Sequence, residues 1–292
     1  MAWLMSLFIE QTLNGVQFGV MLFLMAAGLT LIFGIMNLIN LAHGSIYMAG
    51  AFFGATLFKL TGSFTLAIVL AVLASALVGA IIEWVVLRHF YARGHLDQVL
   101  VTFGLILISN DMVRLIWGVL PLPLSPPRSL AGSVQLFGDI YYPTFRLLVL
   151  GVGSAVALGL YLMVSHTRIG MWIRAGASNR PMASALGVDV QLLFLLVFSL
   201  GAALAGLAGM MAAPLTSVQM GMGEPILILA LVVTVVGGIG SIRGAFVAAI
   251  VIGIGDTFGR IFLPQAFGSM AIFMLMAAIL ALRPKGLFSV HA

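Results

Sequence analysis

The sequence predicts an all-α, polytopic integral membrane protein in which residues 1–292 form a single transmembrane domain. Hydrophobic residues make up 62% of the chain and charged residues only 7%, whereas soluble domains carry about 25% charged residues. Apolar runs of about 20 residues recur along the chain, which is the length that a helix needs to cross a bilayer. The short alternating segments typical of a membrane β-barrel do not occur. A water-soluble fold is therefore excluded.

The apolar runs define about eight or nine membrane segments, some of them short or re-entrant. In chain order they cover Thr12–Met36, Ser45–Phe58, Phe64–Leu87, Val99–Leu120, Thr144–Ser165, Leu192–Ala213, Ile226–Val236, Ala245–Phe262 and Ala266–Leu282. Ser45–Phe58 would be about 21 Å long as a helix, which is short for a hydrocarbon core of about 30 Å. If this segment crosses, the chain has nine spans and its amino terminus lies outside. If it is re-entrant, the chain has eight spans and the amino terminus lies inside.

The connecting loops predict the orientation of the chain in the membrane. The loop at 88–97 carries a net charge of +1, and the loop at 166–191 and the tail at 283–292 carry +2 each. The other connections are neutral or carry −1. By the positive-inside rule the three basic stretches, and with them the carboxyl terminus, are cytoplasmic. The first ten residues lack a basic region and a cleavage site, so we expect no removable signal peptide.

The loop at 166–191 is predicted to contain a short helix. Asn179-Arg180-Pro181 resembles a helix start, since proline is tolerated in the first turn, and Gly187 resembles a helix end. Met182, Ala185 and Leu186 share one face of the two turns between them. A helix this short is not stable alone in water. We therefore expect it to dock on another surface.

Asn37, Asn40 and His43 form the most polar patch in an apolar setting. Polar groups inside a membrane are costly and usually face a cavity or a partner. These side chains either line a solute path or satisfy backbone groups freed by a helix break. The two roles are compatible, and the sequence leaves both open.

The few charged residues near the membrane segments are expected to have structural roles. Asp111 and Arg114, at i and i+3, and Asp256 and Arg260, at i and i+4, are predicted to form ion pairs within their helices. Glu224 lies beside a proline in an outer connection and is expected to be solvated. Unpaired carboxylates within spans, which proton-coupled transporters usually carry, are therefore scarce.

The sequence also excludes several functions. It contains no phosphate-binding P-loop, no HExxH or GxSxG motif and no pair of carboxylates with catalytic spacing, so we expect neither an enzyme nor a chain that binds ATP by itself. Cysteine is absent from the sequence, and no metal-ligand cluster is recognisable, so we expect no metal site. The net charge of +5 lies in the membrane-flanking loops and does not indicate nucleic-acid binding.

Glycine patterns indicate close helix packing. Gly201, Ala205 and Gly209 form a small face at four-residue spacing, and GGIGSIRG at 237–244 is predicted to be a tight turn with a glycine contact at Gly240 and Gly244. Residues 43–55 resemble residues 240–253 in a Gly-Ser-Ile opening followed by small residues. This match indicates either an internal transporter repeat or a coincidence in a chain with 34 glycines.

Three motifs resemble the permease subunits of bacterial branched-chain amino acid ABC importers, specifically the LivH type. They are GLTLIFGIMNLINLAHGSIYMAGAF at 28–52, IGMWIRAGASNRPMASALGVDV at 169–190 and VVGGIGSIRGAFVAAIVIG at 235–253. In this family the first motif carries Asn-x-x-His-Gly, and the second lies in the cytoplasmic loop. The chain departs from the family at Ser178-Asn179, where an acidic residue is common. The resemblance covers nearly the whole chain.

The resemblance implies an ABC importer in the bacterial cytoplasmic (inner) membrane. This chain and a second, homologous permease subunit would move branched-chain amino acids or related small solutes inward by alternating access. Two ATPase subunits would bind ATP and Mg, so this chain would need no cofactor, and an external solute-binding protein would deliver the solute. Similar members also serve urea, short amides or aromatic acids.

The resemblance further implies that the loop at 166–191 holds the coupling helix, seated in a groove of an ATPase subunit. The residues expected to couple are Arg168, Gly170, Arg174, Asn179, Met182, Ala183, Leu186 and Gly187. The alternative from another functional class is a secondary transporter or channel that acts alone.

Overall fold

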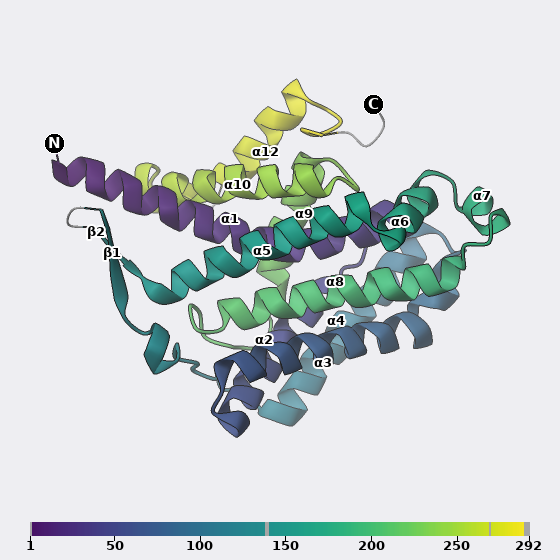
Figure 1. Cartoon of the computed structure of the whole chain (residues 1–292), viewed down its shortest axis with the longest axis horizontal. Helices are drawn as coiled ribbons and strands as arrows, with labels where there is room; N and C mark the ends of the chain where they lie inside the picture. The colour runs from purple at the N-terminus through teal and green to yellow at the C-terminus, as the bar shows by residue number, and fades with distance from the viewer. Residues whose placement is uncertain (1, 138–139, 269, 289–292) are drawn as a thin grey trace.

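The computed structural model describes residues 2–137, 140–268 and 270–288, and it is a bundle of helices that run mostly along one direction (Figure 1). The elements are α1 (Ala2–Met36), α2 (His43–Thr61), α3 (Phe64–Val85), η1 (Leu87–Phe90), α4 (His95–Trp117), η2 (Arg128–Leu130), β1 (Ser133–Phe137), β2 (Ile140–Pro143), α5 (Thr144–His166), α6 (Arg168–Ser178), α7 (Arg180–Ala185), α8 (Val190–Ala212), α9 (Gly223–Gly237), α10 (Ile242–Phe262), α11 (Gln265–Gly268) and α12 (Ala271–Leu282).

Six of these helices are long and apolar enough to cross a membrane, within the residues described: α1, α3, α4, α5, α8 and α10. The helices α9 and α12 are apolar but shorter. The predicted all-α membrane fold is confirmed, and most predicted segments match a helix to within a few residues. The last predicted segment, Ala266–Leu282, is divided into α11 and α12. The sequence prediction also missed a two-stranded antiparallel hairpin, β1 with β2, in the proline-rich connection.

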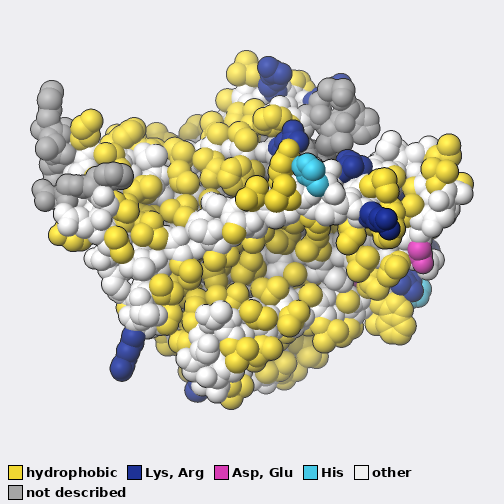
Figure 2. Space-filling model, viewed as in Figure 1, with side chains coloured by type: hydrophobic (Ala, Val, Ile, Leu, Met, Phe, Trp, Pro, Cys, Tyr) yellow, Lys and Arg dark blue, Asp and Glu magenta, His cyan; other side chains and the backbone are white. Residues whose placement is uncertain are grey.

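The helices α1 and α8 form the centre of the bundle. In their most apolar stretches 78% and 67% of residues are buried, against 17–22% in α3, α4 and α5. The outer faces of α3 and α4 carry large exposed apolar side chains such as Leu73, Leu77, Leu107 and Ile108, and the visible face of the molecule is predominantly apolar (Figure 2). This distribution is what a bilayer requires, because its hydrocarbon core solvates apolar side chains.

Glycines bring the central helices into backbone contact. A Cβ on Gly28 of α1 would press against the backbone of Gly201 of α8, and a Cβ on Gly50 of α2 would overlap the backbone of Gly206. The predicted small face of α8 therefore packs against α1 and α2, as small residues at helix interfaces usually do.

The chain doubles back inside the bundle after α1. His43, the first residue of α2, lies beside the middle of α1, where its ring Nε2 is 3.2 Å from the carbonyl oxygen of Met25. Residues 37–42 therefore return along α1 without helical structure. Asn37 starts this return with a φ of +50°, the one positive φ of a non-glycine residue in the described chain. The re-entrant part is thus the stretch before α2, and α2 itself is a helix of 19 residues.

The helix α9 crosses the bundle instead of following it. It begins against Gly44 of α2, its Thr234 accepts a hydrogen bond of 3.2 Å from Thr30 of α1, and it ends with Gly237 against Gly244 of α10. The two segments with similar sequences, in α2 and α10, therefore each place a glycine against one end of α9. The predicted tight turn after α9 is confirmed, with Gly238 and Gly240 at φ +97° and +81°.

Alanine substitution at a packed glycine and at an unpacked glycine tests the backbone contact between helices. We expect Gly50→Ala to lower the stability by about 1–3 kcal/mol, because the Gly206 backbone has to shift. Gly151→Ala in α5 is the control, since its Cβ meets nothing within 4 Å, and it should be neutral or gain up to about 1 kcal/mol from helix propensity. Thermal unfolding in detergent measures both. Equal midpoints for the two variants would refute the backbone contact.

Candidate functional site

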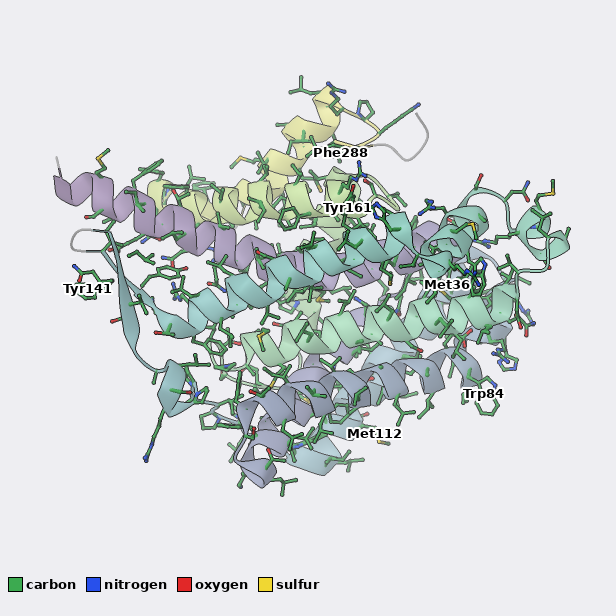
Figure 3. The ribbon with its side chains drawn as sticks, viewed as in Figure 1. Met36, Trp84, Met112, Tyr141, Tyr161 and Phe288 are labelled. Atoms are coloured by element: carbon green, nitrogen blue, oxygen red, sulfur yellow. The ribbon has the colours of Figure 1, made fainter. Side chains whose placement is uncertain are left out.

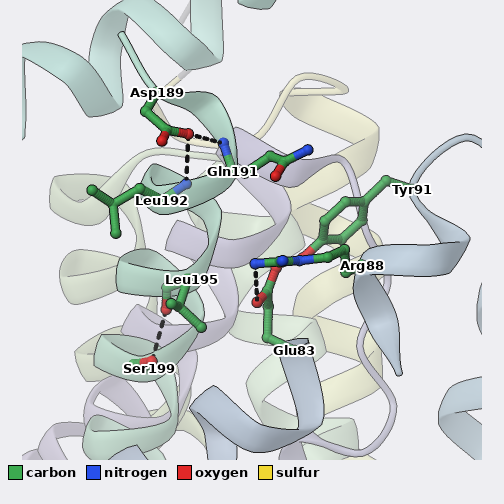
Figure 4. Close-up of polar contacts among 8 residues, drawn as sticks. All are labelled: Glu83, Arg88, Tyr91, Asp189, Gln191, Leu192, Leu195 and Ser199. Carbon is green, nitrogen blue, oxygen red and sulfur yellow. Dashed lines mark hydrogen bonds and ion pairs between the residues drawn. The ribbon is translucent and has the colours of Figure 1, made fainter. Parts of the chain in front are cut away.

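Side-chain caps define the helices at the end of the bundle that carries α6 and α7. The Thr167 hydroxyl accepts from the Gly170 amide at 3.1 Å at the start of α6, and the Asn179 side chain accepts from the Met182 amide at 3.0 Å at the start of α7. Asp189 caps α8 through the amides of Gln191 and Leu192 (Figure 4). These caps satisfy amides that lack partners at helix starts, so the predicted start of α7 is confirmed.

The helix α7 presents apolar side chains to the outside. Met182 and Leu186 are 59% and 76% exposed, and Ala185 on the same face is also exposed. Ala183 faces inward and is 2% exposed. Gly187 ends the helix with a φ of +88°, as its sequence position predicts. A six-residue helix with an unpartnered apolar face matches the predicted docking element.

The helix α6 was not predicted, although it occupies 11 residues of the loop. It buries Gly170, Ile173 and Gly176 and exposes the larger apolar residues Ile169, Met171 and Trp172. Gly170 lies so close to the carbonyl oxygens of Met163 and Val164 that a Cβ would overlap them, and Arg174 donates to the Val164 carbonyl. These contacts hold α6 directly against the end of α5. Arg168 projects outward and is exposed.

Arg180 connects α7 to the centre of the bundle. Its Nε donates to the carbonyl oxygen of Ile35, one residue before the end of α1, at 3.0 Å. Its guanidinium also lies 5.4 Å from the ring centroid of Phe194 on α8, within the range of a cation–π contact. Arg180 was absent from the predicted coupling residues. Ile35 lies 145 residues away from it in sequence, and no local pattern signals a bond over such a separation.

Phe194 also contacts Tyr91, which belongs to a polar cluster with Glu83 and Arg88 (Figure 4). The ring of Tyr91 meets Phe194 edge to face at 5.0 Å, and the Tyr91 hydroxyl donates to Glu83 at 2.5 Å. Arg88 lies 3.9 Å from the other carboxylate oxygen of the fully buried Glu83. Burial, followed by the hydrogen bond to Glu83, raises the pKa of Tyr91, so its hydroxyl remains a donor at physiological pH. The end of α3 is thereby linked to α8 and α7.

The predicted polar patch is divided between two environments. Asn40 and His43 are fully buried inside the subunit, and neither polar atom of the Asn40 side chain has a hydrogen-bond partner. Asn37 is exposed and lines a cavity at the end of α1. The structure thus brings only Asn37 to a surface that a solute or ligand reaches directly. A role of the three residues in the solute path stays a prediction.

Of the three predictions about charged residues, one is confirmed and two are wrong. Arg260 donates to Asp256 at 2.8 Å, as predicted. Asp111 and Arg114 are both exposed on the surface of α4 and form no ion pair in the described part of the chain. Glu224 is not simply solvated: it accepts a hydrogen bond of 2.9 Å from Asn110 of α4. Across the described residues, no group of three or more potential metal-ligating side chains comes together.

Comparisons with known proteins place this arrangement in a family. The family model described as branched-chain amino acid transport system / permease component matches residues 11–280. The branched-chain amino acid permease BraD of Pseudomonas aeruginosa is 30% identical, over 96% of this chain and 95% of its own length. LivH of Escherichia coli K12 is 27% identical over the same shares of the two chains, and the ribose import permease RbsC of that strain is 26% identical over 79% of this chain and 71% of its own.

One solved structure shares the fold. It is PsaBC from Streptococcus pneumoniae in complex with a Fab, which aligns with a TM-score of 0.50 at 15% identity. The alignment covers 92% of this chain and 89% of that chain. At this identity the likeness concerns the arrangement of helices only.

The anchoring of α7 by Arg180 leads to a prediction about local opening. We expect Arg180→Ala to speed amide hydrogen exchange in α7 on the order of tenfold, since a charged hydrogen bond and a cation–π contact are lost. Arg168→Ala is the matched control, because Arg168 is exposed and its side chain forms no hydrogen bond or ion pair to the described residues. Exchange measured by mass spectrometry in detergent should separate the two. Identical exchange would show that Arg180 is not an anchor.

Proposed function

Because this chain belongs to the family of permease components of branched-chain amino acid transport systems, we propose that it forms the membrane pathway of an ABC importer for branched-chain amino acids. It is a multi-pass membrane protein, and the proposal places it in the bacterial cytoplasmic membrane. Its relatives are transport permeases and not enzymes, and ATP with Mg is bound by separate ATPase subunits. The similar protein RbsC is named a ribose import permease. Sequence similarity of this degree therefore does not by itself restrict the solute to amino acids.

The observation that carries this proposal is the exposed apolar face of α7 on a rigid base. Met182 and Leu186 project outward, while the caps at Asn179 and Asp189 and the bonds of Arg180 hold the helix in place. Apolar residues on a short helix outside the membrane need a protein partner to leave water. A groove on an ATPase subunit provides that partner, and α7 is then the coupling helix.

The anchors of α7 suggest how motion of an ATPase subunit reaches the pathway. A displacement of α7 acts through Arg180 on the end of α1 and on Phe194 of α8, the two central helices of the bundle. Phe194 transmits this displacement to Tyr91 and to the Glu83 cluster at the end of α3. Tightly packed helices move as bodies and do not deform gradually. Tilting of these helices against a second permease subunit gives alternating access.

The same proposal orients the chain. The end with α6 and α7 is cytoplasmic because it holds the basic loops, and Met36 and Trp84 lie at this end while Tyr141 lies at the other (Figure 3). Helix α1 then starts outside, which favours the prediction of an external amino terminus.

The residues that follow α12 lie at the cytoplasmic end in this orientation. The amides of Leu287 and Phe288 donate to the carbonyls of Val236 and Gly237 at the end of α9, so residues 283–288 are cytoplasmic. Residues 289–292, the last four of the predicted cytoplasmic tail, lie outside the description. An external solute-binding protein delivers the solute to the opposite end.

The docking of α7 is tested with a charge on its apolar face. We expect Leu186→Asp to reduce uptake and co-purification of ATPase subunits at least about tenfold, because a buried leucine contributes about 1.5–3 kcal/mol and an aspartate would be buried unpaired. The subunit should still insert, since Leu186 is 76% exposed. Leu120→Asp at the other end is the control, being 77% exposed, and it should retain the ATPase subunits. Full co-purification with Leu186→Asp would contradict the proposal.

The energy source separates this function from a transporter that acts alone. In membrane vesicles, uptake should stop when ATP is removed even if the proton and sodium gradients are maintained. Uptake that continues on an ion gradient would exclude the ABC importer. The solute itself is identified by ligand binding to the external protein encoded with this chain.

A further inference from the structure

A cavity of about 700 Å³ opens at the cytoplasmic end of the bundle, where α1, α5, α6 and the turn before α10 meet. The volume lies within the range of about 300–1,000 Å³ typical of small-ligand sites. The helix motion described above does not act through it, although Asn37 of its lining is a candidate for the solute path and Arg174 is among the residues expected to couple. Its polar lining consists of Thr30, Asn37, Tyr161, Ser165, Ser178 and Ser241, together with the arginines Arg174 and Arg243.

The two arginines of the cavity lack a counter-ion. No carboxylate is among the lining residues, and the ion pairs of the described chain involve only Arg88 and Arg260. One nitrogen of Arg243 donates to the Tyr161 hydroxyl at 3.1 Å, and its guanidinium stacks 4.7 Å from the centre of that ring. Arg174 donates to the Val164 carbonyl. Each guanidinium is therefore oriented by one partner and keeps donors for an anion.

The cavity lies at the boundary between membrane and cytoplasm. Tyr161 is five residues before the end of α5, about 7.5 Å along the helix, so part of the cavity lies within the apolar span. Leu31, Phe33, Ile173, Ile239 and Ile242 supply apolar lining. The space-filling view shows several Lys or Arg side chains and a histidine at this end, among apolar side chains (Figure 2).

The neighbouring helix α6 has the features of a helix at a membrane surface. Its exposed apolar residues Ile169, Met171 and Trp172 lie between Arg168 and Arg174 in the sequence. Amphipathic helices that carry arginines together with exposed tryptophan and other large apolar residues lie in the interface of a bilayer. Arginines beside an apolar-walled pocket on the cytoplasmic side are suited to an anionic headgroup above its acyl chains.

We propose that this cavity binds the headgroup of an anionic phospholipid of the cytoplasmic leaflet. Arg174 and Arg243 contact the phosphate, the hydroxyl and amide groups of the lining bind the polar remainder, and the acyl chains leave along the apolar wall. An acidic protein segment fits less well. It would have to enter the apolar span at the level of Tyr161, where its backbone N–H and C=O groups would lack hydrogen-bond partners. The bound lipid then joins α5 and α6 to the turn before α10.

The test compares two double variants with the same change of charge. The subunit is purified in mild detergent from bacterial membranes, and the lipids retained per subunit are counted by mass spectrometry. We expect R174Q/R243Q to retain on the order of tenfold less phosphatidylglycerol and cardiolipin, with phosphatidylethanolamine unchanged. The control R93Q/R283Q removes two exposed arginines of the same end that do not line the cavity, and it should retain as much anionic lipid as the unmodified chain.

Each other outcome overturns the proposal. Equal losses in both double variants would mean that surface charge alone attracts the lipid, and equal retention would mean that the cavity does not hold it. Loss of ATPase subunits without loss of lipid would assign the arginines to a protein contact. Displacement of the bound lipid by millimolar inorganic phosphate would reveal a general phosphate site.

A measurement on the unmodified chain covers the case in which R174Q/R243Q does not fold. Delipidated subunit is titrated with phosphatidylglycerol or with phosphatidylcholine, and amide exchange of α6 is followed. Saturable protection of α6 by phosphatidylglycerol only is the expected result. Equal protection by both lipids, or none by either, would overturn the proposal.

Discussion

The architecture depends on the close approach of helix backbones to α1. Glycines at positions 15, 19, 28 and 34 of this helix meet the backbones of α10, α8 and the turn at Gly240. In a bilayer the hydrophobic effect does not distinguish a helix neighbour from a lipid, so helices associate through tight packing of small residues. These contacts allow α1 and α8 to be buried in the centre while bulky side chains of α3 and α4 face outward. We expect the subunit to be most rigid at these backbone contacts.

The same rigidity explains why a few contacts connect α7 to the whole bundle. Arg180 reaches the end of α1 and the face of α8 together, and both helices are fixed to their neighbours along their length. In the proposed coupling, a force on α7 would therefore move helices and would not merely bend a loop. The buried Glu83 cluster adds a second attachment through Tyr91 and Phe194. Breaking such a buried charge cluster is costly because a charge would remain unpaired.

In the proposed orientation and assembly, the cytoplasmic end combines two kinds of surface on adjacent helices. The helix α7 offers Met182 and Leu186 for a protein groove, whereas α6 offers Trp172 and its arginines beside an apolar cavity. Their contacts with the body also differ. The helix α6 is held by backbone proximity at Gly170, and α7 is held by the side chain of Arg180. A lipid at the cavity and an ATPase subunit at α7 would both act on the end of α1, the lipid through the cavity lining and the ATPase subunit through Arg180.

The sequence alone determined the membrane class, the segments and the local signals, because these depend on composition and on neighbours within a turn or two. The cap at Asn179, the stop at Gly187 and the pair Asp256–Arg260 belong to this group. Only the tertiary structure decided which polar groups meet across long separations. It joined Glu224 to Asn110 and Arg180 to Ile35, left Asp111 without Arg114, and laid α9 across the bundle. Such contacts depend on how helices distant in sequence pack, and no local pattern encodes that packing.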